Sequence, residues 1–319
     1  MENLDFKEAI IVDCLNVSVL NENYFKKMKC AGVTAINYTV AASQNLSETI
    51  KRIFTIQEII EENNDKALLA TKAEDVLKAK NEGKVAIFLG FQGVNPLEGN
   101  LAFLKLYKKL GIRIIQPSYH FRSIVCDGCL EKTDCGLSLF GVKFVEEMNK
   151  LGMLIDLAHV GKRSTLEIIE ISKDPVIFSH SNARALVDTY QNKTDEEIKA
   201  LAEKGGVICV SLLPRLLGER PNLNVNNLID HIEYIVNLVG SKHVGIGTDL
   251  VEGQAENPEM RRVMLKIDGK IYEYPKDIDS ISKFPKIIKA LLERGFSKNE
   301  IKDIIGGNFL RVAKQVLKE

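Results

Sequence analysis

Eight short runs rich in valine and isoleucine recur along this 319-residue chain, separated by segments whose apolar residues have helical spacing. Continuous apolar runs are typical of parallel strands that are covered on both faces. Eight strand-helix units predict a closed (β/α)8 TIM barrel that takes in residues 1–319 as one domain. A doubly wound open sheet is the alternative, because it uses the same alternation. The runs are Ile10–Asp13, Val33–Thr39, Lys84–Gln92, Ile112–Tyr119, Met153–His159, Pro175–His180, Gly206–Leu213 and His243–Asp249.

The segments between the runs predict the outer helices. Leu101–Leu110, Leu139–Leu151 and Thr194–Lys204 carry apolar residues at helical spacing with charges between them. Two stretches are longer than a minimal barrel needs. Residues 41–82 predict two helices, and residues 250–280 predict an irregular, charged segment that is a candidate lid over the barrel rim.

The residues that end the runs are the informative ones, because both folds place their chemistry at the carboxyl ends of strands. His159 and His180 end neighbouring runs, and two neutral imidazoles there can share one divalent ion, although a hydrogen-bonded histidine is the plainer alternative. Asp249 is predicted to bind metal or move a proton, or else to cap a helix. Asp13 is predicted to be structural. The eight ends are Asp13, Thr39, Gln92, Tyr119, His159, His180, Leu213 and Asp249.

Charge and cysteine content restrict the partners and the compartment. Forty-three basic residues balance forty-three acidic ones, so we expect a small-molecule substrate, no nucleic acid and no membrane. The start of the chain lacks the features of a signal peptide, and six cysteines then predict free thiols and a cytoplasmic location. A second metal site is the alternative for the cysteines at 14, 126, 129 and 135.

Several blocks, in order along most of the chain, resemble the membrane (renal-type) dipeptidases, peptidase family M19. The resemblance implies a zinc barrel, often dimeric, that hydrolyses dipeptides with a hydroxide held between two metal ions. A homodimer is therefore expected as well. The blocks are residues 87–93, 127–131, 136–138, 148–160, 178–186, 245–249 and 306–311.

The resemblance also assigns roles to individual residues. His159 and His180 match the two histidines that hold one zinc ion, Asp249 matches the acid/base aspartate, and Tyr119 falls where the family contacts substrate. The family's first-strand motif, Asp-x-His-x-Asp, has Leu15 and Val17 in place of its two metal ligands.

Two further positions depart from the family pattern. The glutamate that bridges the metals is replaced by Gln92, and the arginine that grips the substrate carboxylate is replaced by Gln191. Because a neutral amide cannot bridge two ions as a carboxylate does, the site is expected to hold one ion at most.

These observations predict a dipeptidase-like hydrolase of a peptide or amide bond, with at most one zinc ion on His159 and His180. Gln92, Tyr119 and Gln191 are expected to contact the substrate or its water, and Asp249 to transfer the proton. The first alternative is a metal-free, inactive homologue that acts as a binding or scaffold protein. The second is an isomerase or lyase that uses the same groups as acids and bases.

Overall fold

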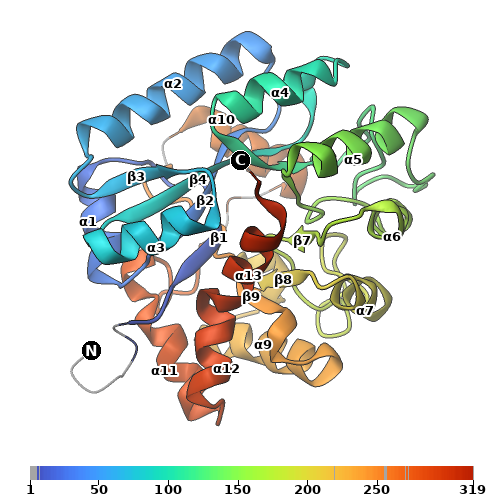
Figure 1. Ribbon diagram of the computed structural model, residues 1–319. Helices are drawn as coiled ribbons and strands as arrows, with labels where there is room; N and C mark the ends of the chain where they lie inside the picture. Colours follow the sequence, from blue (N-terminus) through green and yellow to red (C-terminus); the bar gives the residue numbers. More distant parts are fainter. Residues whose placement is uncertain are drawn as a thin grey trace.

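The computed structural model describes residues 6, 8–218, 220–254, 257–269, 271 and 273–318. All eight predicted runs contain a parallel strand (Figure 1). One sheet pairs β1, β2, β4, β5 and β6 in that order, and a second pairs β7, β8 and β9. Their bounds are β1 (Val12–Asn16), β2 (Ala35–Ala41), β4 (Val85–Gln92), β5 (Ile112–Gln116), β6 (Leu154–Ile155), β7 (Ile177–Phe178), β8 (Val207–Val210) and β9 (Val244–Ile246).

Single bridges join the two sheets at both edges. Asp156 pairs with Ile177 across the seam between β6 and β7, and Asn16 pairs with Leu250 just beyond β9. The backbone N–H of Asp249 also donates to Leu15 O at 3.0 Å. The curled sheet therefore returns to its first strand, which confirms the barrel and excludes the open doubly wound sheet.

A short ninth strand, β3 (Ala67–Ala70), corrects the prediction for residues 41–82. The two predicted helices are present as α2 (Leu46–Glu62) and α3 (Ala73–Glu82), but β3 lies between them. It pairs with Val85–Phe88 of β4, whereas β5 pairs with Leu89–Gln92. β3 thus pairs with the first half of β4, and β5 pairs with the second half.

Helices surround the strands, and the three predicted from apolar spacing are all present (Figure 1). Thr194 caps α7 through a reciprocal capping box with Glu197, which satisfies backbone N–H groups that the helix itself leaves open. Within the described ranges, we find no helix with the length and apolarity that crossing a membrane requires. The remaining bounds are α1 (Glu22–Cys30), α4 (Ala102–Lys109), α5 (Leu139–Leu151), α6 (Lys162–Ile171), α7 (Asp195–Glu203), α8 (Pro214–Leu217), α9 (Val225–Val239), α10 (Pro258–Asp268), α11 (Pro285–Glu293), α12 (Lys298–Lys302) and α13 (Asn308–Val316).

The stretch after β9 is more ordered than its composition predicts. Residues 250–280 were expected to be irregular, yet α10 spans about a third of them. Residues 255, 256, 270 and 272 of this stretch lie outside the described residues.

Helix α13 covers the end of the barrel at which the strands begin. Phe309 on α13 packs edge-on against Phe88 of β4, with ring centroids 5.9 Å apart. Val312 and Val316 join the same buried cluster as Val12 of β1, and Figure 1 shows α13 near the centre of the ring of strands. With this end filled, the carboxyl ends of the strands are left for a binding site.

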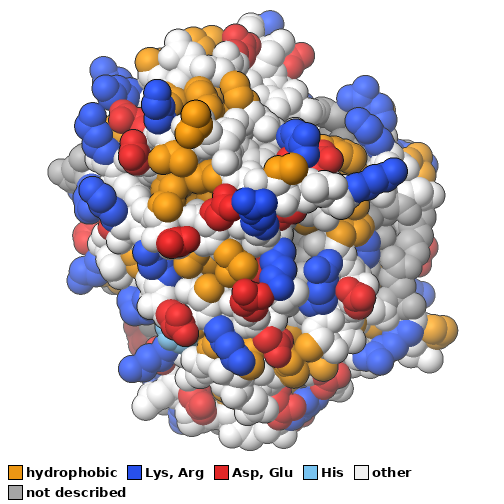
Figure 2. All heavy atoms as spheres, turned by 90° about the vertical axis from the view of Figure 1, so that its right-hand side faces the viewer, with side chains coloured by type: hydrophobic (Ala, Val, Ile, Leu, Met, Phe, Trp, Pro, Cys, Tyr) orange, Lys and Arg blue, Asp and Glu red, His pale blue; other side chains and the backbone are white. Residues whose placement is uncertain are grey.

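Charges of both signs are interspersed on the face seen in Figure 2, among scattered apolar side chains. Ion pairs among the described residues include Lys162 with Glu196 at 2.7 Å and Arg163 with Glu167 at 2.8 Å. This face therefore agrees with the balanced charge of the sequence.

Candidate active site

A cavity of about 350 Å³ opens beyond the carboxyl ends of the strands. Five of the six residues predicted for the site line it, and the sixth, His180, reaches it through His159. The barrel thus brings together residues that are more than 150 positions apart in sequence, from Gln92 to Asp249. The five lining residues are Gln92, Tyr119, His159, Gln191 and Asp249.

Three polar side-chain atoms converge at the edge of this cavity. The Nε2 atoms of His159 and His180 are 3.0 Å apart, and Gln92 Oε1 lies 2.9 Å from His159 Nε2. Two imidazole nitrogens on one tetrahedral zinc ion, each at about 2.0–2.1 Å from it, would be roughly 3.3 Å apart. The observed spacing therefore fits one ion between the two histidines.

A chain of buried hydrogen bonds fixes the orientation of His180. Ser179 Oγ lies 2.7 Å from His180 Nδ1 and donates to Asp156 Oδ2 at 2.5 Å. Asp156 also accepts from Gln116 Nε2 at 2.6 Å. With the hydroxyl proton directed at Asp156, Ser179 accepts from Nδ1–H, which leaves the Nε2 lone pair of His180 directed at His159.

Gln92 is oriented in a similar way. Its Nε2 donates to Thr39 Oγ1 at 2.8 Å, which turns Oε1 toward His159. Gln92 at the end of β4 thus presents an amide oxygen to the histidine pair.

Burial keeps the histidines neutral, the form that binds metal ions. Burial, followed by the charges of Arg215 and Lys193, lowers the pKa of His180 to about 3. Burial, followed by the neighbouring histidines, lowers the pKa of His159 well below its ordinary value. Both imidazoles are therefore unprotonated bases at neutral pH.

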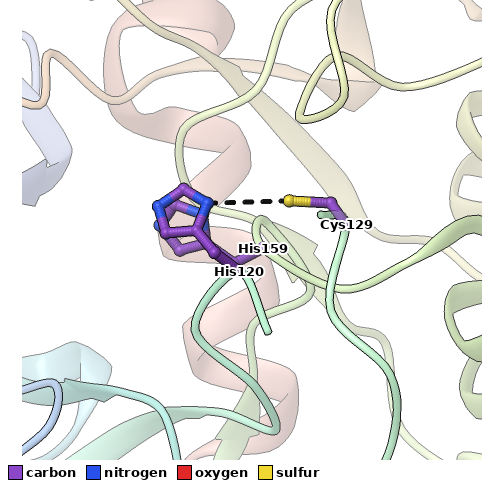
Figure 3. Close-up of side chains that lie close together, drawn as sticks. All are labelled: His120, Cys129 and His159. Carbon is purple, nitrogen blue, oxygen red and sulfur yellow. Dashed lines mark hydrogen bonds between the residues drawn. The ribbon is translucent and has the colours of Figure 1, made fainter. Parts of the chain in front are cut away.

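His120 and Cys129 are two members of the site that the predicted set did not include. In Figure 3 the His120 ring lies beside that of His159, with centroids 4.0 Å apart, and His120 Nδ1 is 3.7 Å from Cys129 Sγ. One ligand atom of each of the three residues lies within 4.8 Å of the others. Burial raises the pKa of the Cys129 thiol to about 11, so without a metal the sulfur stays protonated. All six cysteines are free thiols, as predicted.

The sequence contained a signal for His120, since it directly follows the run end at Tyr119. The backbone turns into the left-handed region at His120, with φ 62°, which directs its ring back over the cavity. Cys129 was considered only as part of a second metal site with other cysteines, because its contact with His120 depends on the folding of the loop.

Arg215 is a third residue that the sequence interpretation missed. It lies on α8, just after β8, lines the cavity and is 7% exposed. Its Nη2 donates to Gln191 Oε1 at 2.8 Å, and Gln191 Nε2 donates to His180 O at 3.0 Å. The amide of Gln191 is therefore held between Arg215 and the backbone of His180.

Asp249 and Tyr119 both face the cavity. Asp249 has φ 57°, a conformation that aspartate tolerates better than most residues, and its carbonyl accepts from the Tyr274 hydroxyl. The Tyr119 ring stands edge-on to His159, with centroids 4.8 Å apart.

Two apolar residues follow one another closely at the end of β1. Val17 lines the cavity, and Leu15 is buried. Asp13 is structural, as predicted, because it accepts from the N–H and the hydroxyl of Thr248, both at 2.7 Å, and from Asn16. Burial raises its pKa to about 6. Neither Leu15 nor Val17 therefore offers a side-chain donor for a second ion.

Known proteins are similar to this chain over most of its length. The model of the family described as membrane dipeptidase (peptidase family M19) matches residues 13–265 and 266–318. Dipeptidase tcpJ of Claviceps purpurea is 30% identical over 275 residues, which are 85% of this chain and 60% of that protein. Dipeptidase 3 of Mus musculus is 32% identical over 78% of this chain and 47% of its own length. The chain thus spans about half to two thirds of the length of these relatives.

Solved structures show the same fold over nearly the whole chain. An amidohydrolase from Pseudomonas aeruginosa is 32% identical, with a TM-score of 0.93 and 98% of both chains covered. A metallo peptidase from Rhodobacter sphaeroides, liganded with a phosphinate mimic of the dipeptide L-Ala-D-Ala, is 16% identical, with a TM-score of 0.83 over 97% of this chain and 99% of that one. The chain belongs to the membrane dipeptidase family, peptidase family M19.

Proposed function

We propose that this protein hydrolyses a peptide or amide bond in a small, dipeptide-like molecule, with one zinc ion held by His159 and His180. The observation that carries the proposal is the 3.0 Å approach of the two Nε2 atoms at the edge of the cavity. The names of the family and of its relatives support the class of substrate. The resemblance to this family implies a pair of metal ions. Leu15 and Val17, however, offer no donor for a second ion.

A divalent ion held by His159 and His180 would supply Lewis acidity for the attack of water on an amide carbonyl. In our proposal Asp249 accepts the proton of the attacking water and passes it to the amine as the carbon–nitrogen bond breaks. Gln92 Oε1 orients that water by accepting a hydrogen bond. Tyr119 packs against the substrate beside His159.

The decisive measurement is the metal content of protein purified without chelator, by inductively coupled plasma mass spectrometry. We expect about one equivalent of zinc in the wild type and a loss of it in His159→Ala and His180→Ala. His243→Ala is the matched control, because His243 bonds to Gly206 O at 3.0 Å, away from the cavity. Zinc retained in His180→Ala contradicts the proposed ligands.

Cys129→Ser separates this ligand pair from the alternative set of His120, Cys129 and His159. We expect the serine variant to keep its zinc. If zinc is lost there and kept in His180→Ala, the ion belongs to the sulfur-containing set. A dipeptide screen with and without chelator, read by release of free amino acid, then tests the activity itself.

A metal-free binding protein is the second candidate. It is favoured by one observation, the hydrogen bond between Gln92 Oε1 and His159 Nε2, which satisfies both atoms without an ion. Absence of metal from every preparation, together with a melting temperature that chelator and zinc leave unchanged, would establish this candidate in place of the hydrolase.

We also propose a cytoplasmic location, which the six free thiols support. A homodimer remains a prediction from the family resemblance. Light scattering coupled to size-exclusion chromatography measures the mass of the assembly directly.

A further inference from the structure

We propose that His120, Cys129 and His159 form a binding site for a soft, thiol-preferring metal ion. The site differs from the zinc position proposed above, because it includes Cys129 and omits His180. It does not depend on hydrolysis or on bound zinc, so it can be tested in protein that has neither.

The backbone of the loop after β5 holds Cys129 against both histidines. The N–H of Cys129 donates to His159 O, and the N–H of Leu130 donates to His120 O, both at 2.8 Å. A Cβ on Gly128 would lie 2.2 Å from His120 O, so glycine is needed for the loop to approach this closely. The place of Cys129 beside the two imidazoles is therefore fixed by main-chain contacts and does not depend on its side-chain rotamer alone.

The side chains have nearly the spacing of ligands on one ion. Cys129 Sγ lies 3.7 Å from His120 Nδ1, as Figure 3 shows. A sulfur and a nitrogen on one tetrahedral zinc ion, at about 2.3 Å and 2.0–2.1 Å from it, would be roughly 3.6 Å apart. One ligand atom of His159 lies within 4.8 Å of the other two, so a small movement of a side chain completes the set.

The hydrogen bonds of His159 leave one of its nitrogens for this ion. Its Nε2 lies between two acceptors, Gln92 Oε1 at 2.9 Å and the Nε2 lone pair of His180 at 3.0 Å. Nε2 must therefore carry the proton, which places the lone pair on Nδ1. Nδ1 is buried and has no hydrogen-bond partner among the residues that the structure describes. A buried acceptor in this state indicates a missing ligand.

The charge around the site explains why a thiol is needed. After burial and the neighbouring histidines, the charges of Arg215 and Lys193 lower the pKa of His159. A metal ion on His159 meets the same positive charges, and an anionic ligand offsets them. Cys129 is the member of the set that becomes an anion, because its thiol is partly exposed and loses its proton to solvent as the ion binds. Thiolate sulfur prefers soft ions.

The test is a titration of the full-length, chelator-treated chain with Cd²⁺, read by thiolate-to-cadmium charge-transfer absorption in the ultraviolet. Glycine is added as a weak competing ligand, so that single exposed thiols do not bind the ion. We expect a band that saturates near one equivalent in the wild type and is lost in Cys129→Ser. It weakens in His120→Asn, since asparagine tolerates the left-handed backbone at this position.

Two variants are controls. Cys135→Ser keeps the band, because Cys135 is an exposed free thiol of the same loop. His180→Ala also keeps it, which separates this site from the proposed zinc ligands.

No band in the wild type overturns the site, and this result requires no variant to fold. A band that persists in Cys129→Ser, or that is lost in Cys135→Ser, also overturns it. So does a band that is lost in His180→Ala and kept in Cys129→Ser, because the ion then lies on the histidine pair. Zinc content and hydrolysis do not enter these titrations, so failure of the proposed function gives a different result from failure of this site.

Discussion

At the scale of single residues, the orientation of the site depends on side chains that do not line the cavity. Ser179 stands between Asp156 and His180 Nδ1, and groups of this kind typically change metal affinity about 10- to 100-fold when they are removed. We therefore predict that Ser179→Ala weakens zinc binding by about that factor. The measurement is competition with a chromophoric chelator.

Ser181→Ala is the control for this prediction. Ser181 is also a buried serine, and its hydroxyl donates to Ala158 O at 3.5 Å. Zinc affinities that fall equally in the two variants would show that loss of any buried hydroxyl, and not the orientation of His180, is responsible.

The same scale shows where sequence interpretation of a site stops. His159, His180 and Asp249 were found because each ends an apolar run, and runs that are parallel strands must end at one rim. Ser179 and Asp156 lie inside such runs and look like ordinary strand residues. Arg215 comes from a short helix after a strand, and nothing in its neighbours indicates that it turns into the cavity. These contacts depend on side-chain directions that only the folded chain determines.

At the scale of elements, the strands were predicted better than the connections. Runs rich in Val and Ile are typical of buried parallel strands. β3 was missed because Ala-Leu-Leu-Ala consists of good helix formers, and only pairing with β4 makes it a strand. α10 was missed because charged residues are interspersed with the apolar ones in its sequence.

Gly247, which follows β9, lies close to the backbone of Ser179, which follows β7. A Cβ on Gly247 would lie 1.8 Å from the backbone oxygen of Ser179 and 3.3 Å from Cys209 Cβ, so the two segments would have to move apart. We predict that Gly247→Ala lowers the free energy of unfolding by about 1–3 kcal/mol or more, as overpacking in a core does. Urea denaturation measures it.

Gly83→Ala is the comparison. A Cβ at Gly83 meets nothing within 4 Å, although its φ is +66°, so only the left-handed backbone costs about 1–2 kcal/mol. If Gly83→Ala lowers the free energy of unfolding more than Gly247→Ala does, the close approach of Gly247 to Ser179 is not important for stability.

At the scale of the whole molecule, the proposed ion lies across one of the two seams that join the sheets of the barrel wall. β6 and β7 belong to different sheets and meet through the single bridge of Asp156 and Ile177, supported by the bond from Leu157 N to Ile177 O at 2.8 Å. His159 follows β6 and His180 follows β7. An ion bound by both would therefore link the six-stranded sheet to the three-stranded one.

Such a link makes the stability of the barrel depend on metal. A ligand at 100 times its Kd that binds only the folded state adds about 2.7 kcal/mol, and for a chain of this size that corresponds to a rise of a few degrees in Tm. We predict that zinc raises the Tm of chelator-treated protein by this amount and that His180→Ala, but not His243→Ala, removes the rise. An equal rise in His180→Ala would mean that zinc stabilises the protein elsewhere than across the seam. A rise that persists in His180→Ala but disappears in Cys129→Ser would place the ion on the loop that carries Cys129, which leaves β7 unlinked.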